Sequence, residues 1–234
     1  MTYFKQRRRL NLDVTHRCPL ECPNCQRQTS FTNNGLVPHG RDLTIKEIKM
    51  IAKFFKDVAF CGQLSDPVHH PKFNEIMKEL KDVPEVFVHN AATAKPMSWY
   101  IKSWKANPKA VWIFACDGLP KDSHKYRKNQ DGEKMFEIMK EAKKHLLSTP
   151  VWQCIRFNYN ENDIETCKKM AEDEGLSFIS VESSRWLSDD DPFMPTKALK
   201  TNKLAKSTTG KPILNPLTIF SATSGVDNKL NIAS

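Results

Sequence analysis

The sequence predicts an α/β fold, a partial (β/α)6 TIM-type barrel followed by a basic, irregular C-terminal tail. Short apolar runs alternate with stretches whose apolar residues recur at helical spacing, which is the pattern of parallel strands joined by right-handed crossovers. The pattern fills only about 175 residues, whereas a closed eight-fold barrel needs about 250. The alternation ends where LSDDDPFMPT (187–196) begins. An open, partial barrel is therefore expected.

Six strands account for the apolar runs. The first, LNLDVT, alternates apolar and polar residues and leads directly into a cysteine-rich stretch. The others are short apolar runs between turn or helix signals. In chain order the expected strands are 10–15, 58–61, 85–89, 110–116, 151–157 and 177–182.

Five helices are expected between these strands. The first has a strong start signal, because Thr44 and Glu47 can form a capping box and Leu43 can pack onto Ile48. Pro71 suits the first turn of the second helix. In chain order the expected helices lie around 44–55, 71–80, 99–104, 138–146 and 164–174.

The chain is expected to divide into a core domain, residues 1–186, and a linker with a C-terminal extension, residues 187–234. The net charge is +9, and residues 195–234 contain six lysines against one acidic residue, Asp227. A basic excess attracts nucleic acid. These lysines are not interleaved with aromatic residues, however, so a solvated tail is favoured and nucleic acid is not expected as a partner.

Composition indicates a soluble, cytoplasmic protein. Hydrophobic residues make up 39% and charged residues 27% of the chain, as in ordinary globular proteins. No apolar run approaches the roughly 20 residues of a membrane span, and no apolar signal core follows the charged first residues. The seven cysteines are an odd number, which does not favour a disulfide framework.

Three cysteines stand close together in CPLECPNC, at positions Cys18, Cys22 and Cys25. They follow the first strand, where barrel folds place their chemistry. Thiolates hold iron–sulfur clusters or zinc, and a closed zinc site needs four ligands, for which His16 is the candidate. Three cysteines around a cubane cluster leave one iron open to a ligand that is not protein. The spacing favours the cluster, with zinc or coincidence as alternatives.

The cysteine motif at the end of a first strand resembles the signature of the radical S-adenosylmethionine (SAM) superfamily. The resemblance covers roughly residues 8–186. It implies that Cys18, Cys22 and Cys25 hold a 4Fe-4S cluster whose open iron binds the amino and carboxylate groups of SAM. It also implies a flavodoxin- or ferredoxin-like electron donor and reductive cleavage of SAM to a radical that takes hydrogen from the substrate.

A second segment, FCGQLSDPVHHP (60–71), resembles the Gly-Gly-Glu-Pro segment of this superfamily, which meets the SAM amino group. Asp stands here for Glu, and Ser for the second Gly. A tight turn before a helix is the alternative explanation, because Asp-Pro favours turns. The resemblance implies cofactor contacts for Gly62, Ser65, Asp66 and Pro67.

The fourth strand leads into FACDGLPKDSHKYR (114–127), which resembles a pattern of the superfamily members that modify peptides and sulfatases. The matching residues are Asp117, Gly118, His124 and Arg127, while Ala115 replaces a serine. The resemblance implies cofactor binding by Asp117 and Arg127, the latter through a guanidinium fork on the SAM carboxylate. An exposed arginine in a basic stretch is the alternative.

Two asparagines complete the expected cofactor contacts. Asn90 in VHNAA is retained from a segment that usually reads Thr-Asn-Gly, although a buried, hydrogen-bonded asparagine would explain it as well. Asn158 in RFNYNEND stands where the superfamily often has a polar contact to SAM. The nearby Asn162 or Asp163 can instead cap the following helix.

The other four cysteines are expected to be buried small apolar side chains on strands or a helix: Cys61, Cys116, Cys154 and Cys167. One cluster per chain is therefore expected. The predicted function is that of a radical SAM enzyme that acts on a peptide, a protein or a small molecule. A deazaguanine-type nucleoside pathway is the alternative enzyme, and a zinc-stabilised nucleic-acid-binding protein is the alternative without catalysis.

Overall fold

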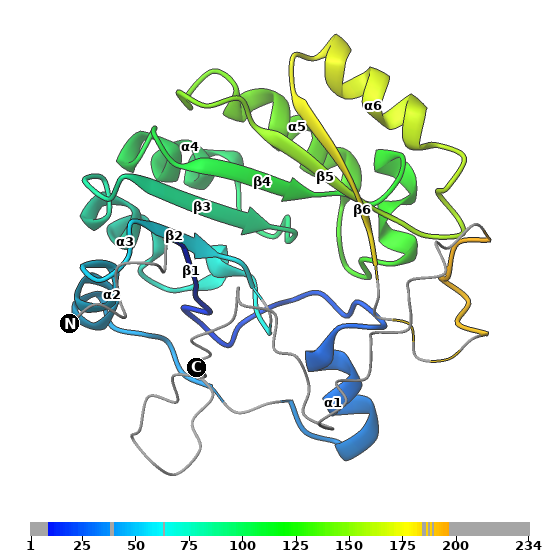
Figure 1. Ribbon diagram of the computed structural model, residues 1–234, viewed down its shortest axis with the longest axis horizontal. Coiled ribbons are helices and arrows are strands. Elements are labelled where there is room, and N and C mark those ends of the chain that lie inside the picture. The colour runs from blue at the N-terminus through cyan, green and yellow to red at the C-terminus, as the bar shows by residue number, and fades with distance from the viewer. Residues whose placement is uncertain are drawn as a thin grey trace, which may run out of the picture.

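The computed structural model describes residues 9–37, 40–62, 64–183, 186, 188 and 190–196. Within them, six parallel strands form one sheet in the order β1-β2-β3-β4-β5-β6 (Figure 1). β1 and β6 are not paired with each other, so the barrel is partial, as predicted. The strands are β1 Arg9–Asn11, β2 Asp57–Phe60, β3 Glu85–Asn90, β4 Val111–Ala115, β5 Val151–Arg156 and β6 Ser177–Glu182.

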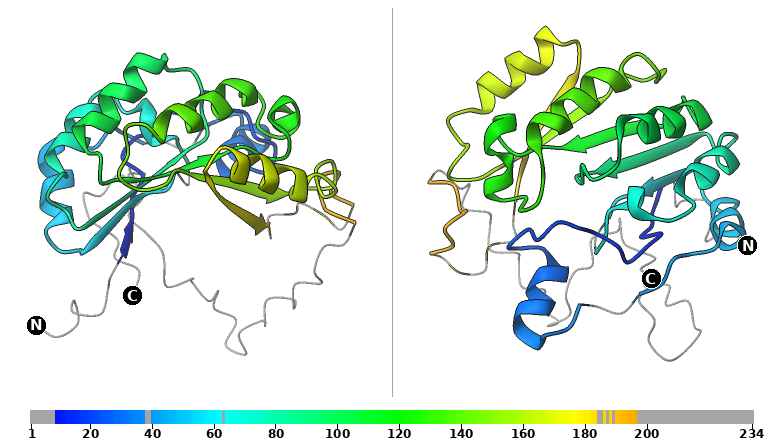
Figure 2. Two further views of the ribbon diagram at one scale, coloured as in Figure 1. Left: turned by 90° about the horizontal axis from the view of Figure 1, so that it is seen from above. Right: turned by 180° about the vertical axis from the view of Figure 1, so that it is seen from behind.

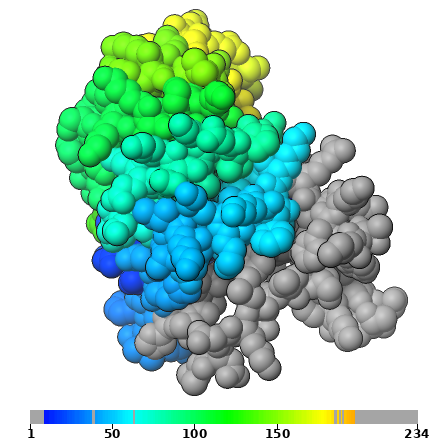
Figure 3. Space-filling view, turned by 90° about the vertical axis from the view of Figure 1, so that its left-hand side faces the viewer, coloured from blue at the N-terminus to red at the C-terminus, as the bar shows by residue number. Residues whose placement is uncertain are grey.

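Helices follow the strands in the predicted alternation, and the views of Figures 1 and 2 show them layered over one face of the sheet. Their bounds are α2 Ile45–Ala52, α3 Phe73–Glu79, α4 Met97–Ala106, α5 Gly132–Ala142 and α6 Ile164–Asp173. Two 3-10 turns stand in loops, η2 Pro67–His69 and η3 Pro120–Lys125. Figure 3 shows the molecule from the left-hand side of Figure 1, and there the chain order runs from the blue N-terminal part to the yellow α6 region.

The start of α2 follows the predicted capping box. The Thr44 hydroxyl accepts a hydrogen bond from the Glu47 backbone N–H, and the Glu47 carboxylate accepts one from the Thr44 N–H at 2.8 Å. The prediction for the next helix is two residues early. α3 begins at Phe73, because Pro71 and Lys72 form a turn that is closed by a hydrogen bond from the Phe73 N–H to the His70 carbonyl at 3.1 Å.

The core lies between the sheet and the helix layer. Along each strand, alternate side chains face the helices, and large aromatic rings fill the space. Trp112 of β4 packs edge-on against Trp104 of α4 and Phe73 of α3, with ring centroids 6.1 Å apart in both pairs. All three side chains are almost fully buried. The opposite residues of the same strands are therefore left to face the inside of the partial barrel.

β1 is shorter than the predicted 10–15. The alternation of burial continues, since Leu12 and Val14 are buried. The backbone beyond Leu12 leaves β2, however: the Val14 carbonyl accepts a hydrogen bond from Leu43 N–H, and the Thr15 hydroxyl donates to Asp42 at 2.6 Å. The chain thus turns away from the sheet just before the cysteines.

One helix, α1 Gln26–Asn34, was not predicted. It lies apart from the helix layer (Figure 1). Its sequence, QRQTSFTNN, has no apolar face, and none of its residues is buried. It ends at Gly35, whose φ of 67° is the left-handed conformation typical of a glycine after a helix. Burial patterns cannot predict such a helix.

The described part of the predicted linker packs on the core. Within residues 190–196, Asp191 is buried and Phe193 meets the ring of Tyr126, with centroids 5.1 Å apart. The basic tail, residues 197–234, lies outside the described residues. The predicted boundary between the core domain and a C-terminal extension at residue 187 therefore remains a prediction. Among the described helices, none is long and apolar enough to cross a membrane.

Candidate functional site

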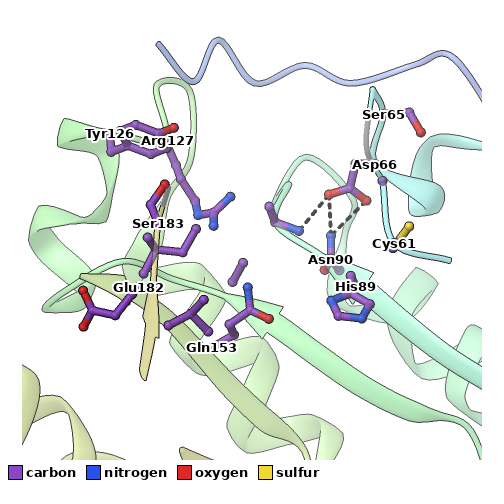
Figure 4. A pocket seen from close by; sticks show the side chains of 15 residues that line it. Cys61, Ser65, Asp66, His89, Asn90, Tyr126, Arg127, Gln153, Glu182 and Ser183 are labelled. Atoms are coloured by element: carbon purple, nitrogen blue, oxygen red, sulfur yellow. Dashed lines mark hydrogen bonds between the residues drawn. The ribbon is translucent and has the colours of Figure 1, made fainter. Parts of the chain in front are cut away.

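A pocket of about 360 Å³ opens inside the partial barrel, at the carboxyl ends of the strands (Figure 4). Its volume is near the lower end of the range for ligand sites. The wall follows β2 to β6 and the loops after them. It is formed by Cys61, Gly62, Ser65, Asp66, His89, Asn90, Ala91, Ala115, Tyr126, Arg127, Gln153, Ile155, Val181, Glu182 and Ser183.

Asp66 organises one side of this pocket. Its Oδ2 accepts hydrogen bonds from the backbone N–H groups of Ala91 at 2.7 Å and Ala92 at 2.8 Å. Asn90 Nδ2 donates to the same oxygen at 3.1 Å (Figure 4). The Val68 N–H donates to Oδ1 at 3.2 Å. The carboxylate thereby joins the loop after β2 to the loop after β3, and its oxygens are occupied by protein donors.

The turn before Asp66 requires glycine. Gly62 has φ of 56°, and a Cβ there would lie 2.2 Å from the Ser65 carbonyl oxygen. The Ser65 hydroxyl donates to Asp13 Oδ1 at 2.9 Å, and the Asp66 N–H donates to the Arg17 carbonyl at 2.9 Å. This turn is therefore held directly against the chain that enters the cysteine motif.

Arg127 and Asp117 form a buried ion pair on the other side of the pocket, with Arg127 Nε 2.7 Å from Asp117 Oδ2. Asp117 Oδ1 accepts from Ile155 N–H at 2.8 Å. Burial opposes the charge of Arg127, but the Asp117 carboxylate holds the pKa of the guanidinium above its usual value. In Figure 4 the guanidinium points from the loop after β4 into the pocket.

The loop after β4 is tied to β3 through Gln130. Its Nε2 donates to the Ala115 carbonyl at 2.8 Å and also to the Ala91 carbonyl. Its Oε1 accepts from the Ser123 hydroxyl, which in turn accepts from the Asp117 N–H at 2.8 Å. A buried polar network thus fixes the backbone that carries Arg127.

The three motif cysteines lie together in a small apolar cluster. Cys22 is buried and Cys18 and Cys25 are half-buried, beside the rings of Tyr126 and Phe157. Burial raises the pKa of Cys18 to about 12, with a contribution from Asp66, and that of Cys22 to about 11, opposed by Arg127. The cysteine loop (residues 18–25) is therefore close to both charged sides of the pocket.

The loop is anchored by backbone contacts and one side-chain pair. Glu21 N–H donates to the Lys128 carbonyl at 3.3 Å, and Asn129 Nδ2 donates to the Pro19 carbonyl at 3.1 Å. Asn24 Nδ2 donates to Asp191 Oδ2 at 2.9 Å. The last contact joins the cysteine loop to the 190–196 segment.

The donor chemistry of the loop fits an iron–sulfur cluster, since three thiols share one apolar cluster and act electrostatically on one another. The side chains are not gathered at one point, however. Across the described residues, no group of three or more His, Cys, Asp or Glu side chains has a metal-binding arrangement. His16, the candidate fourth zinc ligand, has its Nδ1 3.9 Å from Asp42 instead.

The structure brings most of the predicted cofactor contacts into one pocket, whose wall includes Gly62, Ser65, Asp66, Asn90 and Arg127. Pro67 and Asp117 are buried just behind the wall. Asn158 is exposed and does not line the pocket; its N–H donates to the Phe193 carbonyl at 3.1 Å.

Several residues that line the pocket were not predicted as site residues. His89 and Gln153 belong to β3 and β5, Glu182 is the last residue of β6, and Ser183 follows it. Cys61 was expected to be buried, but it is half-buried and lines the pocket. For His89, Gln153 and Cys61 the strand period is the signal, because each lies next to a buried residue of a strand.

No protein-family model and no curated protein matches the sequence. Solved structures do resemble it. Streptococcus suis SuiB bound to S-adenosylmethionine has a TM-score of 0.63 and 10% identity over 81% of this chain and 43% of SuiB. Native anSMEcpe with bound AdoMet has a TM-score of 0.53 and 16% identity over 74% of this chain and 50% of anSMEcpe.

Methylornithine synthase (PylB) resembles the chain with a TM-score of 0.57 and 11% identity, over 94% of this chain and 59% of PylB. Another SuiB structure contains the precursor peptide SuiA. The chain thus spans between 43% and 59% of the length of the three proteins compared. The resemblance to radical SAM enzymes that the cysteine motif indicates is confirmed at the level of the fold.

Proposed function

We propose that this protein is a radical SAM enzyme. Cys18, Cys22 and Cys25 hold a 4Fe-4S cluster, and SAM occupies the pocket beside the cysteine loop. When bound, the cluster supplies the electron that cleaves SAM and starts radical chemistry on the substrate. The observation that carries the proposal is the placement of three cysteines on a loop next to a pocket at the carboxyl ends of parallel strands.

The cysteine loop supplies the thiols. Because burial raises the pKa of Cys18 to about 12 and of Cys22 to about 11, these thiols are protonated at neutral pH without a metal. Cluster binding therefore releases protons from both residues. The loop residues must also move closer together than they are in the structure.

The charged sides of the pocket suit the two ends of the methionyl group of SAM. Arg127 presents a cation that Asp117 holds in place, and it is the candidate partner of the SAM carboxylate. The backbone of Gly62 and Ser65 offers carbonyl groups for the SAM amino group. Asp66 contributes by shaping this turn, since its oxygens already accept hydrogen bonds from protein.

A peptide or protein is the proposed substrate. SuiB, whose fold this chain shares, has been solved with a precursor peptide, and the FACDGLPKDSHKYR segment resembles that of peptide-modifying enzymes. The open edge between β1 and β6 leaves the barrel unclosed in the described residues, which suits a substrate larger than the pocket. A flavodoxin- or ferredoxin-like protein is the proposed electron donor.

Anaerobic reconstitution with iron and sulfide tests the proposal. We expect a brown protein with about four irons per chain, which forms 5′-deoxyadenosine from SAM when reduced by dithionite. Cys22→Ala should lose both properties, and Cys167→Ala, a matched change at a buried cysteine on α6, should keep both. A colourless protein with a single zinc would instead support the zinc-stabilised alternative.

A further inference from the structure

Two polar side chains lie on the inner face of the sheet at the floor of the pocket. His89 comes from β3 and Gln153 from β5, with Ala115 of β4 lining the pocket between those strands. Strands two apart are separated by about 10 Å. Because Ala115 is small, the space between His89 and Gln153 stays open, and Figure 4 shows both below Arg127 and Asn90.

Neither of these two side chains makes a hydrogen bond that stabilises the described part of the fold. Within the described residues, the His89 ring and the Gln153 carboxamide have no hydrogen-bond partner in the protein. Both residues are half-buried. Their partner-free state contrasts with the saturated carboxylate of Asp66 in the same wall. Polar groups that face a pocket without protein partners are the groups available to a ligand.

The charged groups of the same wall already have partners in the protein: Asp66 accepts hydrogen bonds from N–H groups, and two other charged groups form ion pairs. Arg127 is bound to Asp117, and Glu182 Oε1 lies 2.7 Å from Arg156 Nη2. The remaining neighbours, Ile155 and Val181, are apolar. The floor around His89 and Gln153 is therefore polar without carrying an unbalanced charge.

We propose that His89 and Gln153 bind an uncharged polar group of the substrate, a carboxamide or a hydroxyl that both donates and accepts hydrogen bonds. This assignment rests on the proposed function in one respect: the pocket holds a substrate as well as SAM. For a peptide substrate, the side chain that enters the barrel is then an amide or alcohol rather than a charged one.

The protonation state of His89 is consistent with this assignment. Burial, with a contribution from Arg9, lowers the pKa of His89 to about 4. The ring is therefore neutral at pH 7, with one nitrogen that donates and one that accepts. Gln153 likewise offers both a donor and an acceptor. Among the described residues that line the pocket, Arg127 is the one permanent cation; Asp117 holds it and we assign it to SAM, so no cation is left for an anionic group of the substrate.

The test uses the purified protein without cluster, so its outcome does not depend on SAM cleavage. With ¹³C-labelled histidine, the His89 signal is the one of seven that His89→Leu removes. Acetamide is titrated as the probe, with acetate and methylammonium as probes of similar size that carry charge. We expect acetamide to shift the His89 signal, and acetate and methylammonium to leave it in place.

Variants locate the binding. Gln153→Leu should weaken acetamide binding at least tenfold, whereas Gln28→Leu on α1 should leave it unchanged. Gln153→Glu keeps the size of the side chain but adds a negative charge, so this variant should bind methylammonium in preference to acetamide. The remaining histidine signals report whether each variant is folded. An acetate response as large as that of acetamide, or no response to any probe, would overturn the proposal.

Discussion

The Arg127 guanidinium is held by the Asp117 carboxylate, with Nε 2.7 Å from Oδ2 and both side chains buried. Because Nε carries the ion pair, the two terminal nitrogens are the part of the side chain that can reach SAM. Removing either partner leaves an unpaired buried charge, which is costly. The pair therefore fixes both the position and the charge of the proposed SAM contact.

Arg127→Lys should weaken SAM binding by about 1–3 kcal/mol, because lysine keeps the charge but loses the fork. Isothermal titration with SAM on the reconstituted protein measures this. Arg41→Lys is the matched control, since Arg41 pairs with Glu47 on the surface of α2. Unchanged SAM affinity in the Arg127 variant would remove Arg127 from the site and leave the cluster proposal intact.

Asp66→Asn should destabilise the protein by about 3 kcal/mol, because an amide has a single acceptor oxygen. If that oxygen accepts from the Ala91 and Ala92 N–H groups, the NH2 group faces the donors that now meet Oδ1, Val68 N–H and Asn90 Nδ2. Urea unfolding measures the loss. Asp122→Asn, which removes a surface pair with Lys125, is expected to cost less than about 1 kcal/mol. Equal stability of both variants would contradict the structural role of Asp66.

Gly62→Ala should distort the turn beside the pocket. The new Cβ would meet the Ser65 carbonyl at 2.2 Å, and the positive φ adds strain of about 1–3 kcal/mol. We expect lower stability and weaker SAM binding. At Gly35 the φ is also positive, but a Cβ would meet nothing within 4 Å. Gly35→Ala should therefore lower stability by only about 1 kcal/mol and leave SAM binding intact.

Asp191→Ala should loosen the cysteine loop, because it removes the acceptor of the Asn24 amide. The expected result is faster reaction of Cys22 with a thiol reagent in the cluster-free protein and faster loss of iron after reconstitution. Asp190→Ala, a change at the neighbouring exposed position, is the control. If the two variants react at the same rate, the 190–196 segment does not hold the loop.

Acid should weaken the start of α2. Hydrogen bonds from Arg41 lower the pKa of Glu47 to about 2, below the ordinary value of 4.5. The stability that Glu47 contributes is therefore present above pH 4.5 and is lost as the pH falls toward 2. Since the group is largely solvated, about 1 kcal/mol is expected. Comparing urea unfolding of the protein and of Glu47→Gln at pH 7 and pH 3 measures it, and the difference should shrink at pH 3.

Sequence patterns predicted the sheet because its strands are buried on the helix side and flanked by turn residues. The resemblance of three loop segments to the radical SAM superfamily also predicted part of the pocket wall, namely Gly62, Ser65, Asp66, Asn90 and Arg127. The helix α1 could not be predicted in this way, because no residue of it is buried.

The sequence also did not identify the residues that face the inside of the partial barrel. His89 and Gln153 occur in strands whose neighbouring residues are apolar, so each reads as a tolerated polar residue until the curvature of the sheet is known. Asn158 was expected in the pocket from its place after the fifth strand. The chain turns there toward Phe193, and the Asn158 side chain is left exposed. Loop direction is not encoded in residue spacing.

The contact between Asn24 and Asp191 joins residues 167 positions apart. During synthesis, a chain that grows at about 5–20 residues per second needs roughly 8–33 seconds to add that many residues. Over this interval the thiols of the cysteine loop have been made, and the anchors at Lys128 and Asn129 can form before the one at Asp191. The anchoring of the proposed metal ligands is thus complete only when nearly all of the described chain has been translated.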